Sequence, residues 1–359
     1  MRMLFVTSSL GGGGAERVMS LLINHYYDMG NDIKVVSLVS DRHEYKINSS
    51  IENIFVAKSS NKFVKLFERY LKLKKIVKEY KPDIIISFIA EINIYTLLCT
   101  KKDDNVIISE RNNPNLDPNS KLIRFVRDKI YRKAKTIVFQ TCDARNYFKY
   151  ITDERCFIIP NPVIGDLPKW NPDSKEKFIF SAGRLTKQKN FPLLINAFYE
   201  FHKKHKDYNL VIAGEGEDKE ELEKMIESLD IQKNVRLIGF TKDVHKYMSE
   251  CQMFIQTSNY EGISNALLES LAIGVPTIAT DCPIGGSKMI IKNNENGVLI
   301  QVNDIVALIS AMNNIEENEN FKMKISRNAR KTRETYSVEK IIKDWDNVIE
   351  KRIKKEEKI

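Results

Sequence analysis

Two basic residues in the second half of the chain have the types and spacing needed to bind phosphate. Arg184 and Lys189 lie in the segment AGRLTKQKN, directly after the apolar run at 177–183 that predicts a β-strand. Loops at the carboxyl ends of parallel strands are where α/β sheets bind ligands. A guanidinium can grip two phosphate oxygens as a fork, whereas an ammonium acts as a point charge. We therefore expect this pair to bind a diphosphate and to stabilise it as a leaving group, although such a pair is more often an ordinary feature of the surface.

Two glutamates further along the chain, Glu261 and Glu269, are eight positions apart in NYEGISNALLESLAIGVP. The pattern predicts a helix that begins near Gly262. Since two helical turns span about 7.2 residues, the carboxylate of Glu269 can point the same way as the loop before the helix. Backbone amides in the first turn could bind phosphate, and they belong to Ser264, Asn265 and Ala266. Each glutamate alone would more often be a solvated surface charge, but the combination favours a binding site.

A glycine-rich turn, Gly11–Gly14, follows the first predicted strand and opens a predicted helix. Its unhindered backbone N–H groups could face a phosphate. The turn does not match the G-x-G-x-x-G pattern of dinucleotide-binding proteins, and no acidic residue convincingly ends a strand about 20 positions later. A simple tight turn therefore remains an equal alternative.

Strand-like and helix-like segments alternate along the whole chain, which predicts an α/β fold with parallel sheets. A proline-rich linker that contains Pro160, Pro162, Pro168 and Pro172 separates two such series. At 359 residues the chain is long enough for two domains. The further predicted strands cover 33–39, 83–89, 105–109 and 136–141 in the first half, and 177–183, 209–214, 234–240, 253–258 and 276–281 in the second.

Composition narrows the class of protein. No apolar run approaches 18 residues and the chain does not begin with the pattern of a signal peptide, so we expect a cytoplasmic protein. The five cysteines are scattered, as expected for reduced thiols. Residues 1–165 hold 27 Lys and Arg against 18 Asp and Glu, whereas the remainder holds 30 of each. The basic half suggests an anionic partner such as phosphate, lipid headgroups or nucleic acid, although solvated lysines explain it equally well.

A predicted basic amphipathic helix at 61–81 is the clearest feature of the basic half. Such helices lie on anionic membrane surfaces, and a second segment at 121–135 has a similar composition. Alternatively, the apolar stripe packs on the sheet and the lysines simply face water. The lysines that we expect to contact a membrane or an acceptor are Lys72, Lys74, Lys75 and Lys78.

Taken together, the motifs resemble glycosyltransferase family 4 along nearly the whole chain. The matching pieces are GGAERV (13–18), AGRLTKQKN (182–190), VIAGEGE (211–217), LIGF (237–240) and the E-x7-E pair. The resemblance implies an α/β GT-B fold, in which two Rossmann-like domains face each other across a cleft. We expect an acceptor-binding domain at 1–165, a nucleotide-sugar-binding domain at 166–335, and a C-terminal helix at 336–359 that crosses back onto the first domain.

The resemblance also implies roles for individual residues. Arg184 and Lys189 would hold the donor diphosphate, Glu261 the transferred sugar, and Glu269 the ribose. The nucleobase would meet Gly239 and Phe240, while Gly13 and Gly14 would let the first turn close over phosphate and sugar. Many members carry a histidine near the position of Arg111, which this chain lacks there. Glu110 and Arg111 could replace it as contacts of the sugar or acceptor, or they could form a structural salt bridge.

The implied activity is retaining transfer of a hexosyl or N-acetylhexosaminyl group from a UDP-sugar. The segments SERNNP (109–114) and SFIAEINIYTLL (87–98) are similar to bacterial enzymes that extend polyprenyl-diphosphate-linked oligosaccharides and surface polysaccharides such as capsule and O-antigen. We expect no metal or other cofactor and no nucleic acid, and a peripheral location at the inner face of the cell membrane. The oligomeric state stays open. Alternatives are a transferase with a small soluble acceptor, a nucleotide-sugar epimerase, a nicotinamide-dependent oxidoreductase and a nucleic-acid-binding protein.

Overall fold

The computed structural model describes residues 1–56 and 61–354 of the chain. The chain folds into two compact units, Met1–Pro160 together with the segment from Ile341 onwards, and Asn161–Lys340. The sequence predicts boundaries at 165/166 and 335/336. The boundaries in the structure, 160/161 and 340/341, each differ from these by five residues. Both units are α/β, as predicted.

The first unit is built on a parallel sheet of seven strands in the order β3-β2-β1-β4-β5-β6-β7. Its central strands are buried along their whole length, as expected for a sheet that is covered on both faces. The strands are β1 (Arg2–Thr7), β2 (Asp32–Ser37), β3 (Glu52–Phe55), β4 (Ile84–Phe88), β5 (Val106–Glu110), β6 (Thr136–Phe139) and β7 (Cys156–Ile158).

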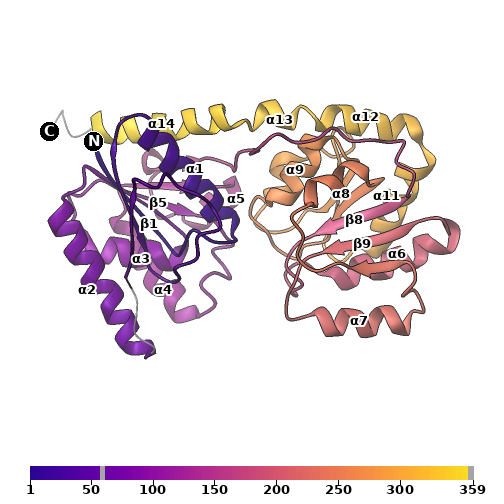
Figure 1. Ribbon diagram of the computed structural model, residues 1–359, viewed down its shortest axis with the longest axis horizontal. Helices are drawn as coiled ribbons and strands as arrows, with labels where there is room; N and C mark the ends of the chain where they lie inside the picture. The colour runs from indigo at the N-terminus through magenta and orange to yellow at the C-terminus, as the bar shows by residue number, and fades with distance from the viewer. Residues whose placement is uncertain (57–60, 355–359) are drawn as a thin grey trace. The chain divides into compact units, whose positions relative to one another are not determined.

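Helices cover both faces of this sheet. In Figure 1, α1 and α14 lie above the strands, whereas α2, α3 and α4 lie below them. Trp345 of α14 stacks on Phe88 at the end of β4, with 5.5 Å between ring centroids. The helices are α1 (Gly14–Asp28), α2 (Lys62–Tyr80), α3 (Ala90–Cys99), α4 (Lys121–Ile130), α5 (Cys142–Tyr147), α14 (Val338–Lys354) and the short 3₁₀ turns η1 (Tyr131–Lys133) and η2 (Asp153–Arg155).

The second unit contains a parallel sheet of six strands in the order β10-β9-β8-β11-β12-β13. Successive residues of its central strand face opposite cores, since Ile179 packs in one cluster and Phe178 and Phe180 pack in the other. The strands are β8 (Phe178–Ala182), β9 (Asn209–Ala213), β10 (Val235–Leu237), β11 (Met253–Gln256), β12 (Thr277–Thr280) and β13 (Val298–Ile300).

Two sets of helices form these cores with the second sheet. The helices α6, α7, α11 and α12 contribute to one core, and α8, α9 and α10 contribute to the other. The bounds are α6 (Phe191–Lys204), α7 (Lys219–Ser228), α8 (Val244–Glu250), α9 (Asn265–Ile273), α10 (Gly286–Ile290), α11 (Ile305–Glu317), α12 (Glu319–Ala329) and α13 (Thr332–Thr335).

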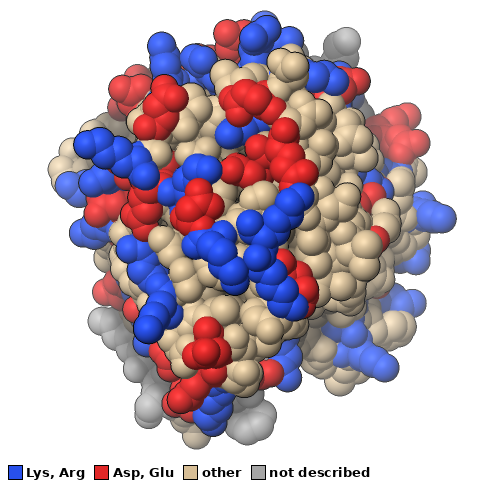
Figure 2. Space-filling model, turned by 90° about the vertical axis from the view of Figure 1, so that its right-hand side faces the viewer, with Lys and Arg blue, Asp and Glu red and all other residues tan. Residues whose placement is uncertain are grey.

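The surface shown in Figure 2 carries basic and acidic side chains that are interspersed. This agrees with the equal numbers of acidic and basic residues in the second half of the chain. Among the described helices, none combines the length and the apolar character that a membrane span requires.

Candidate functional site

The strand order of the second unit creates a binding position between β8 and β11. From β8 the chain winds outward through β9 to β10, whereas β11, β12 and β13 lie on the other side of β8. The loops that leave the carboxyl ends of β8 and β11 therefore diverge, and open α/β sheets bind ligands in the crevice at such a point. These loops carry Arg184, Lys189 and Glu261, and the helix α9 that follows the second loop carries Glu269.

Lys189 and Glu261 meet at this position. The Lys189 ammonium donates a hydrogen bond to Oε2 of Glu261, and the two side chains are 13% and 17% exposed. Further bonds join the same two loops. The Thr257 hydroxyl donates to the carbonyl of Lys189 over 3.0 Å, and the Asn259 amide donates to the carbonyl of Gln188 over 2.7 Å. Hydrogen bonds between the two loops therefore hold the charged pair in position.

Arg184 lies in the same loop with its side chain exposed. Close backbone packing shapes this loop, because a Cβ atom on Gly214 would lie 1.9 Å from the carbonyl oxygen of Gly183. Gly183 itself is covered by the Lys189 side chain, whose Cε atom would be 3.0 Å from an added Cβ. A side chain at position 214 would therefore displace the backbone of this loop, whereas one at position 183 would press on the Lys189 side chain.

The helix between the two glutamates begins later than the sequence suggested. The expected start near Gly262 was wrong, because α9 begins at Asn265 and Ser264 caps it by accepting a hydrogen bond from the amide of Leu267 over 3.4 Å. Only Asn265 and Ala266 of the three expected residues thus belong to the first turn. Asn161 from the linker donates to Oδ1 of Asn265 over 2.8 Å, a contact that the sequence did not predict.

Glu269 lies on α9 and is only 6% exposed. Its Oε2 atom is 2.9 Å from Nε2 of His245 on α8. Sequence reasoning missed His245, because only the fold brings α8 beside α9. The available signal was its position shortly after the LIGF segment, which follows a strand of the same sheet.

The expected nucleobase contact lies in the loop after β10. Gly239 has a φ of +68°, which a residue with a side chain rarely adopts, and its carbonyl accepts a hydrogen bond from Gly214 over 2.8 Å. The neighbouring ring of Phe240 is 70% exposed. An exposed aromatic ring of this kind can stack on a planar base.

Three buried polar side chains at or near the carboxyl end of β11 also went unnoticed in the sequence. Within the described part of the chain, the side-chain amide of Gln256 and the hydroxyls of Ser258 and Ser287 have no hydrogen-bond partner. Buried polar groups are normally satisfied. These three are therefore additional candidates for contact with a bound polar ligand.

In the first unit, Gly13 and Gly14 lie where α1 begins. The carboxylate of Glu16 folds over the turn, so that an added Cβ on Gly13 would lie 2.0 Å from Oε2 of Glu16. The other oxygen of Glu16 accepts a hydrogen bond of 2.6 Å from Ser8. The Glu16 carboxylate therefore occupies the space that a side chain at position 13 would need. Contact between this turn and a phosphate stays a prediction.

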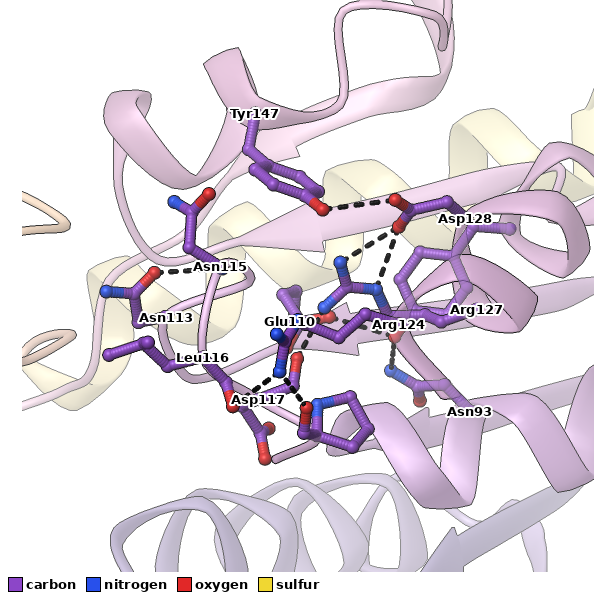
Figure 3. A network of polar contacts seen from close by, with 12 residues as sticks. Asn93, Glu110, Asn113, Asn115, Leu116, Asp117, Arg124, Arg127, Asp128 and Tyr147 are labelled. Atoms are coloured by element: carbon purple, nitrogen blue, oxygen red, sulfur yellow. Dashed lines mark hydrogen bonds and ion pairs between the residues drawn. The ribbon is translucent and has the colours of Figure 1, made fainter. Parts of the chain in front are cut away.

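Glu110 is buried at the end of β5, inside a polar network (Figure 3). Its Oε2 atom accepts a hydrogen bond of 2.9 Å from Tyr131, whose hydroxyl also receives one of 3.0 Å from Asn93. Burial raises the pKa of Glu110 to about 7, although the nearby charge of Arg127 opposes this change. A carboxyl group with such a pKa can exchange a proton near neutral pH.

Arg111 points to a different environment from its neighbour Glu110. Its guanidinium lies over the ring of Phe88, with 4.1 Å from Cζ to the ring centroid, and 5.8 Å from that of Trp345. Burial lowers the pKa of Arg111 to about 9. Such a stacked guanidinium is held by its aromatic neighbours. Its role toward sugar or acceptor stays a prediction.

The four lysines expected to contact a membrane are all exposed on α2. Three of them have described contacts. Lys72 donates to the carbonyl of Val56 over 2.8 Å, Lys74 donates to the Tyr70 hydroxyl over 3.2 Å, and Lys75 lies 3.7 Å from Glu79. These contacts leave the charges at the surface, where a membrane could reach them.

Within residues 1–56 and 61–354, no group of three or more His, Cys, Asp or Glu side chains is arranged to hold a metal ion.

Two protein-family models match the chain and together cover most of it. The model described as Glycosyltransferase Family 4 matches residues 12–165, and the model described as Glycosyl transferases group 1 matches residues 166–332.

Individual proteins match over nearly their full length. A Campylobacter jejuni N-acetylgalactosamine-N,N'-diacetylbacillosaminyl-diphospho-undecaprenol 4-alpha-N-acetylgalactosaminyltransferase is 30% identical over 356 residues, which cover 94% of this chain and 96% of that protein. A second C. jejuni protein, GalNAc-alpha-(1->4)-GalNAc-alpha-(1->3)-diNAcBac-PP-undecaprenol alpha-1,4-N-acetyl-D-galactosaminyltransferase, is 25% identical over 97% of this chain and 98% of its own length. The crystal structure of Anabaena Alr3699/HepE in complex with UDP has the same fold, with a TM-score of 0.83, 17% identity, and coverage of 98% of this chain and 100% of that one.

Proposed function

The chain belongs to glycosyltransferase family 4 and is a glycosyltransferase with the GT-B fold, and we propose that it transfers a sugar from a UDP-sugar to a lipid-linked or polysaccharide acceptor with retention of configuration. The main observation in support of this proposal is the ion pair between Lys189, after β8, and Glu261, after β11. Arg184 lies in the same loop as Lys189.

The donor diphosphate would bind to Arg184 and Lys189. The Lys189 ammonium pairs with Glu261, so an arriving diphosphate would share or replace that partner. Both cations would then stabilise the negative charge that develops on the departing nucleoside diphosphate. Once Lys189 is engaged by phosphate, the Glu261 carboxylate becomes available to accept hydrogen bonds from sugar hydroxyls.

The nucleoside would lie along the neighbouring loops. Glu269, held by His245, is suited to accept hydrogen bonds from the ribose hydroxyls. The exposed ring of Phe240 beside Gly239 is suited to contact the base. UDP is the nucleotide in the Anabaena crystal structure, which makes uridine diphosphate the first nucleotide to test. No step of this scheme calls for a cofactor.

The acceptor and the stereochemistry are proposed from the relatives. The names of both C. jejuni proteins specify undecaprenol-linked acceptors and α-linked products. An α-linked product formed from an α-linked nucleotide sugar requires retention at the anomeric carbon. We assign the first unit to the acceptor, with Glu110 and Arg111 at the carboxyl end of β5 as the candidate contacts and α2 as the surface that meets the membrane.

The decisive experiment incubates the purified protein with a panel of nucleotide sugars and an undecaprenyl-diphosphate-linked oligosaccharide. We expect one UDP-sugar to be consumed with extension of the acceptor, and NMR of the product to show an α linkage. Arg184→Ala should lose transfer, whereas Arg236→Ala, which removes an exposed arginine that pairs with Glu176 on the same unit, should keep it. Extension by Arg184→Ala at the wild-type rate would refute the donor site.

A further inference from the structure

A hollow of the first unit lies at the opposite end of the strands from Glu110. It has a volume of about 630 Å³. Val106, the first residue of β5, lines it together with Lys135 and Arg155, which directly precede β6 and β7. Because Glu110 is the last residue of β5, the length of that strand separates this hollow from the candidate acceptor residues.

The lining of this hollow is strongly basic. Seven of its residues are Lys or Arg and three are Asp or Glu, which gives a formal excess of four positive charges (7 − 3). Cations gathered around a concavity attract anions more strongly than the same charges spread over a flat surface. The volume is in the range of small-molecule sites. Charge and shape therefore both indicate an anionic ligand.

Three of the cations are held in place by neutral oxygen atoms. Lys135 donates to the carbonyl of Asp103 over 2.8 Å, Arg155 to the carbonyl of Arg132 over 3.0 Å, and Arg352 through Nε to Oδ1 of Asn105 over 2.8 Å. Each of these bonds restricts the positions that its cation can take. The positive groups are thus positioned in advance, which lowers the cost of ordering them around a ligand.

The Arg155 guanidinium is a second, independent indication that the hollow binds an anion. Its Nε atom is buried and has no hydrogen-bond partner within the described residues. Burial also lowers the pKa of the Arg155 guanidinium, which means that its surroundings do not fully compensate the charge. An anion in the hollow would supply both the acceptor and the opposite charge.

We propose that this hollow is a binding site for a phosphate-bearing anion with at least two negative charges, separate from the site of sugar transfer. Lys and Arg together suit phosphate, because arginine forms forked hydrogen bonds to its oxygens and lysine adds a point charge. The anion is either a soluble phosphate compound or the headgroup of an anionic lipid. Since Arg352 belongs to α14, binding also fastens the C-terminal helix to the first unit.

The test locates binding by hydrogen–deuterium exchange, with inorganic pyrophosphate as the probe. Binding in the hollow should slow exchange in the backbone segments 100–106, 131–136 and 152–156. Pyrophosphate that binds only at the donor loop would instead slow exchange near Arg184. The Arg184→Ala variant, which weakens the donor loop alone, should keep the protection of the three segments.

Two variants of the hollow are compared with a matched control. Lys101→Ala combined with Lys133→Ala removes two exposed charges, and Arg155→Ala removes the guanidinium whose Nε atom is buried. The control, Arg327→Ala combined with Lys331→Ala, removes two exposed charges from a smaller basic hollow of about 300 Å³ on the second unit. We expect the pyrophosphate Kd to rise at least tenfold in the double variant of the first hollow and to stay within twofold in the control.

Vesicles distinguish the two sources of phosphate. Cosedimentation with phosphatidylglycerol vesicles that is lost in the Lys101→Ala, Lys133→Ala variant identifies a lipid headgroup, whereas loss of pyrophosphate binding alone identifies a soluble anion. The proposal is overturned if the wild type shows neither interaction in these segments, or if the double variant binds both probes as well as the wild type.

Discussion

The ammonium of Lys189 and the carboxylate of Glu261 form an ion pair between residues 72 positions apart in the chain. Lys189 belongs to the loop after β8, and Glu261 belongs to the loop after β11. The pair therefore connects the two elements on either side of the binding position. It joins two groups that are both expected to contact the donor.

Lys189→Met should reduce sugar transfer by about 100-fold, because one of two cations that stabilise the leaving diphosphate is lost. It should also lower the free energy of unfolding by about 1–3 kcal/mol, because it leaves the largely buried Glu261 carboxylate without this partner. Adding Glu261→Gln should restore part of the stability and none of the activity. Measurement of both quantities across this double-mutant cycle tests the pair, and equal activity in all four proteins would contradict the assignment.

His245→Ala should weaken donor binding while leaving the transfer step itself nearly unchanged. His245 on α8 bonds to the Glu269 carboxylate on α9. Loss of the histidine therefore leaves this carboxylate less well positioned for the ribose that it is expected to bind. The ribose is remote from the reacting atoms. We expect a roughly tenfold rise in the Kd for UDP, measured by calorimetry, and partial rescue by His245→Gln. His205→Ala, which removes a histidine bonded to Asn313 at the other side of the unit, is the control. Equal Kd values in both variants would refute a positioning role.

Much of the fold was predictable because buried parallel strands are short apolar runs. The nine further predicted strands and the first strand of the chain correspond to β1, β2, β4, β5, β6 and β8 to β12. The strands β3, β7 and β13 were missed. Each is an edge strand of three or four residues, and a run this short shows too little periodicity to predict a strand.

The site was predictable only where its parts follow one another in the chain. Arg184 and Lys189 share one loop, and Glu261 and Glu269 flank one helix start, so spacing identified them. His245 could not be found in this way, because its contact with Glu269 depends on the packing of α8 against α9. The start of α9 was placed too early because the capping serine, Ser264, stands three residues after the first glutamate and its role depends on the local backbone.

The lysines of α2 should control attachment to anionic membranes. Each lysine near such a surface contributes about 1 kcal/mol. Neutralising Lys74, Lys75 and Lys78 to Gln should therefore reduce partitioning onto phosphatidylglycerol vesicles by about 100-fold, as measured by flotation. Lys72 is left in place because it also bonds to the Val56 carbonyl. The control changes three exposed lysines of the second unit to Gln, namely Lys219, Lys224 and Lys233. Flotation equal to that of the wild type would mean that α2 makes no membrane contact.

Arg111→His should retain sugar transfer if this residue contacts substrate in the way expected of a histidine at this position. An imidazole can also stack on Phe88, the ring that the guanidinium covers. We expect at least one tenth of the wild-type rate, with Arg111→Ala clearly lower. A folded but inactive Arg111→His protein, judged by circular dichroism and a transfer assay, would show that the charge or reach of arginine is essential.

Glu110 should make the first unit less stable as the pH rises. Its pKa is about 7 in the folded protein, because burial disfavours the charge, against an ordinary value of 4.5. Between these values the folded protein keeps a proton that the unfolded chain has released. The unfolded state therefore binds fewer protons, and the free energy of unfolding falls with increasing pH, by up to about 3 kcal/mol in total. Below pH 4.5 both states are protonated and this contribution is constant.

Glu110→Gln removes this dependence, because an amide stays neutral throughout while its oxygen can still accept the hydrogen bond from Tyr131. Between pH 5 and pH 7.5 the free energy of unfolding of the wild type should fall by about 2–3 kcal/mol more than that of the variant. Urea unfolding at the two pH values measures this difference. The control Glu227→Gln removes an exposed carboxylate from α7 and should leave the pH dependence unchanged. If Glu110→Gln and the wild type lose stability in parallel over this range, the carboxyl group is already ionised at pH 5, and a role for Glu110 as a proton carrier near neutral pH is excluded.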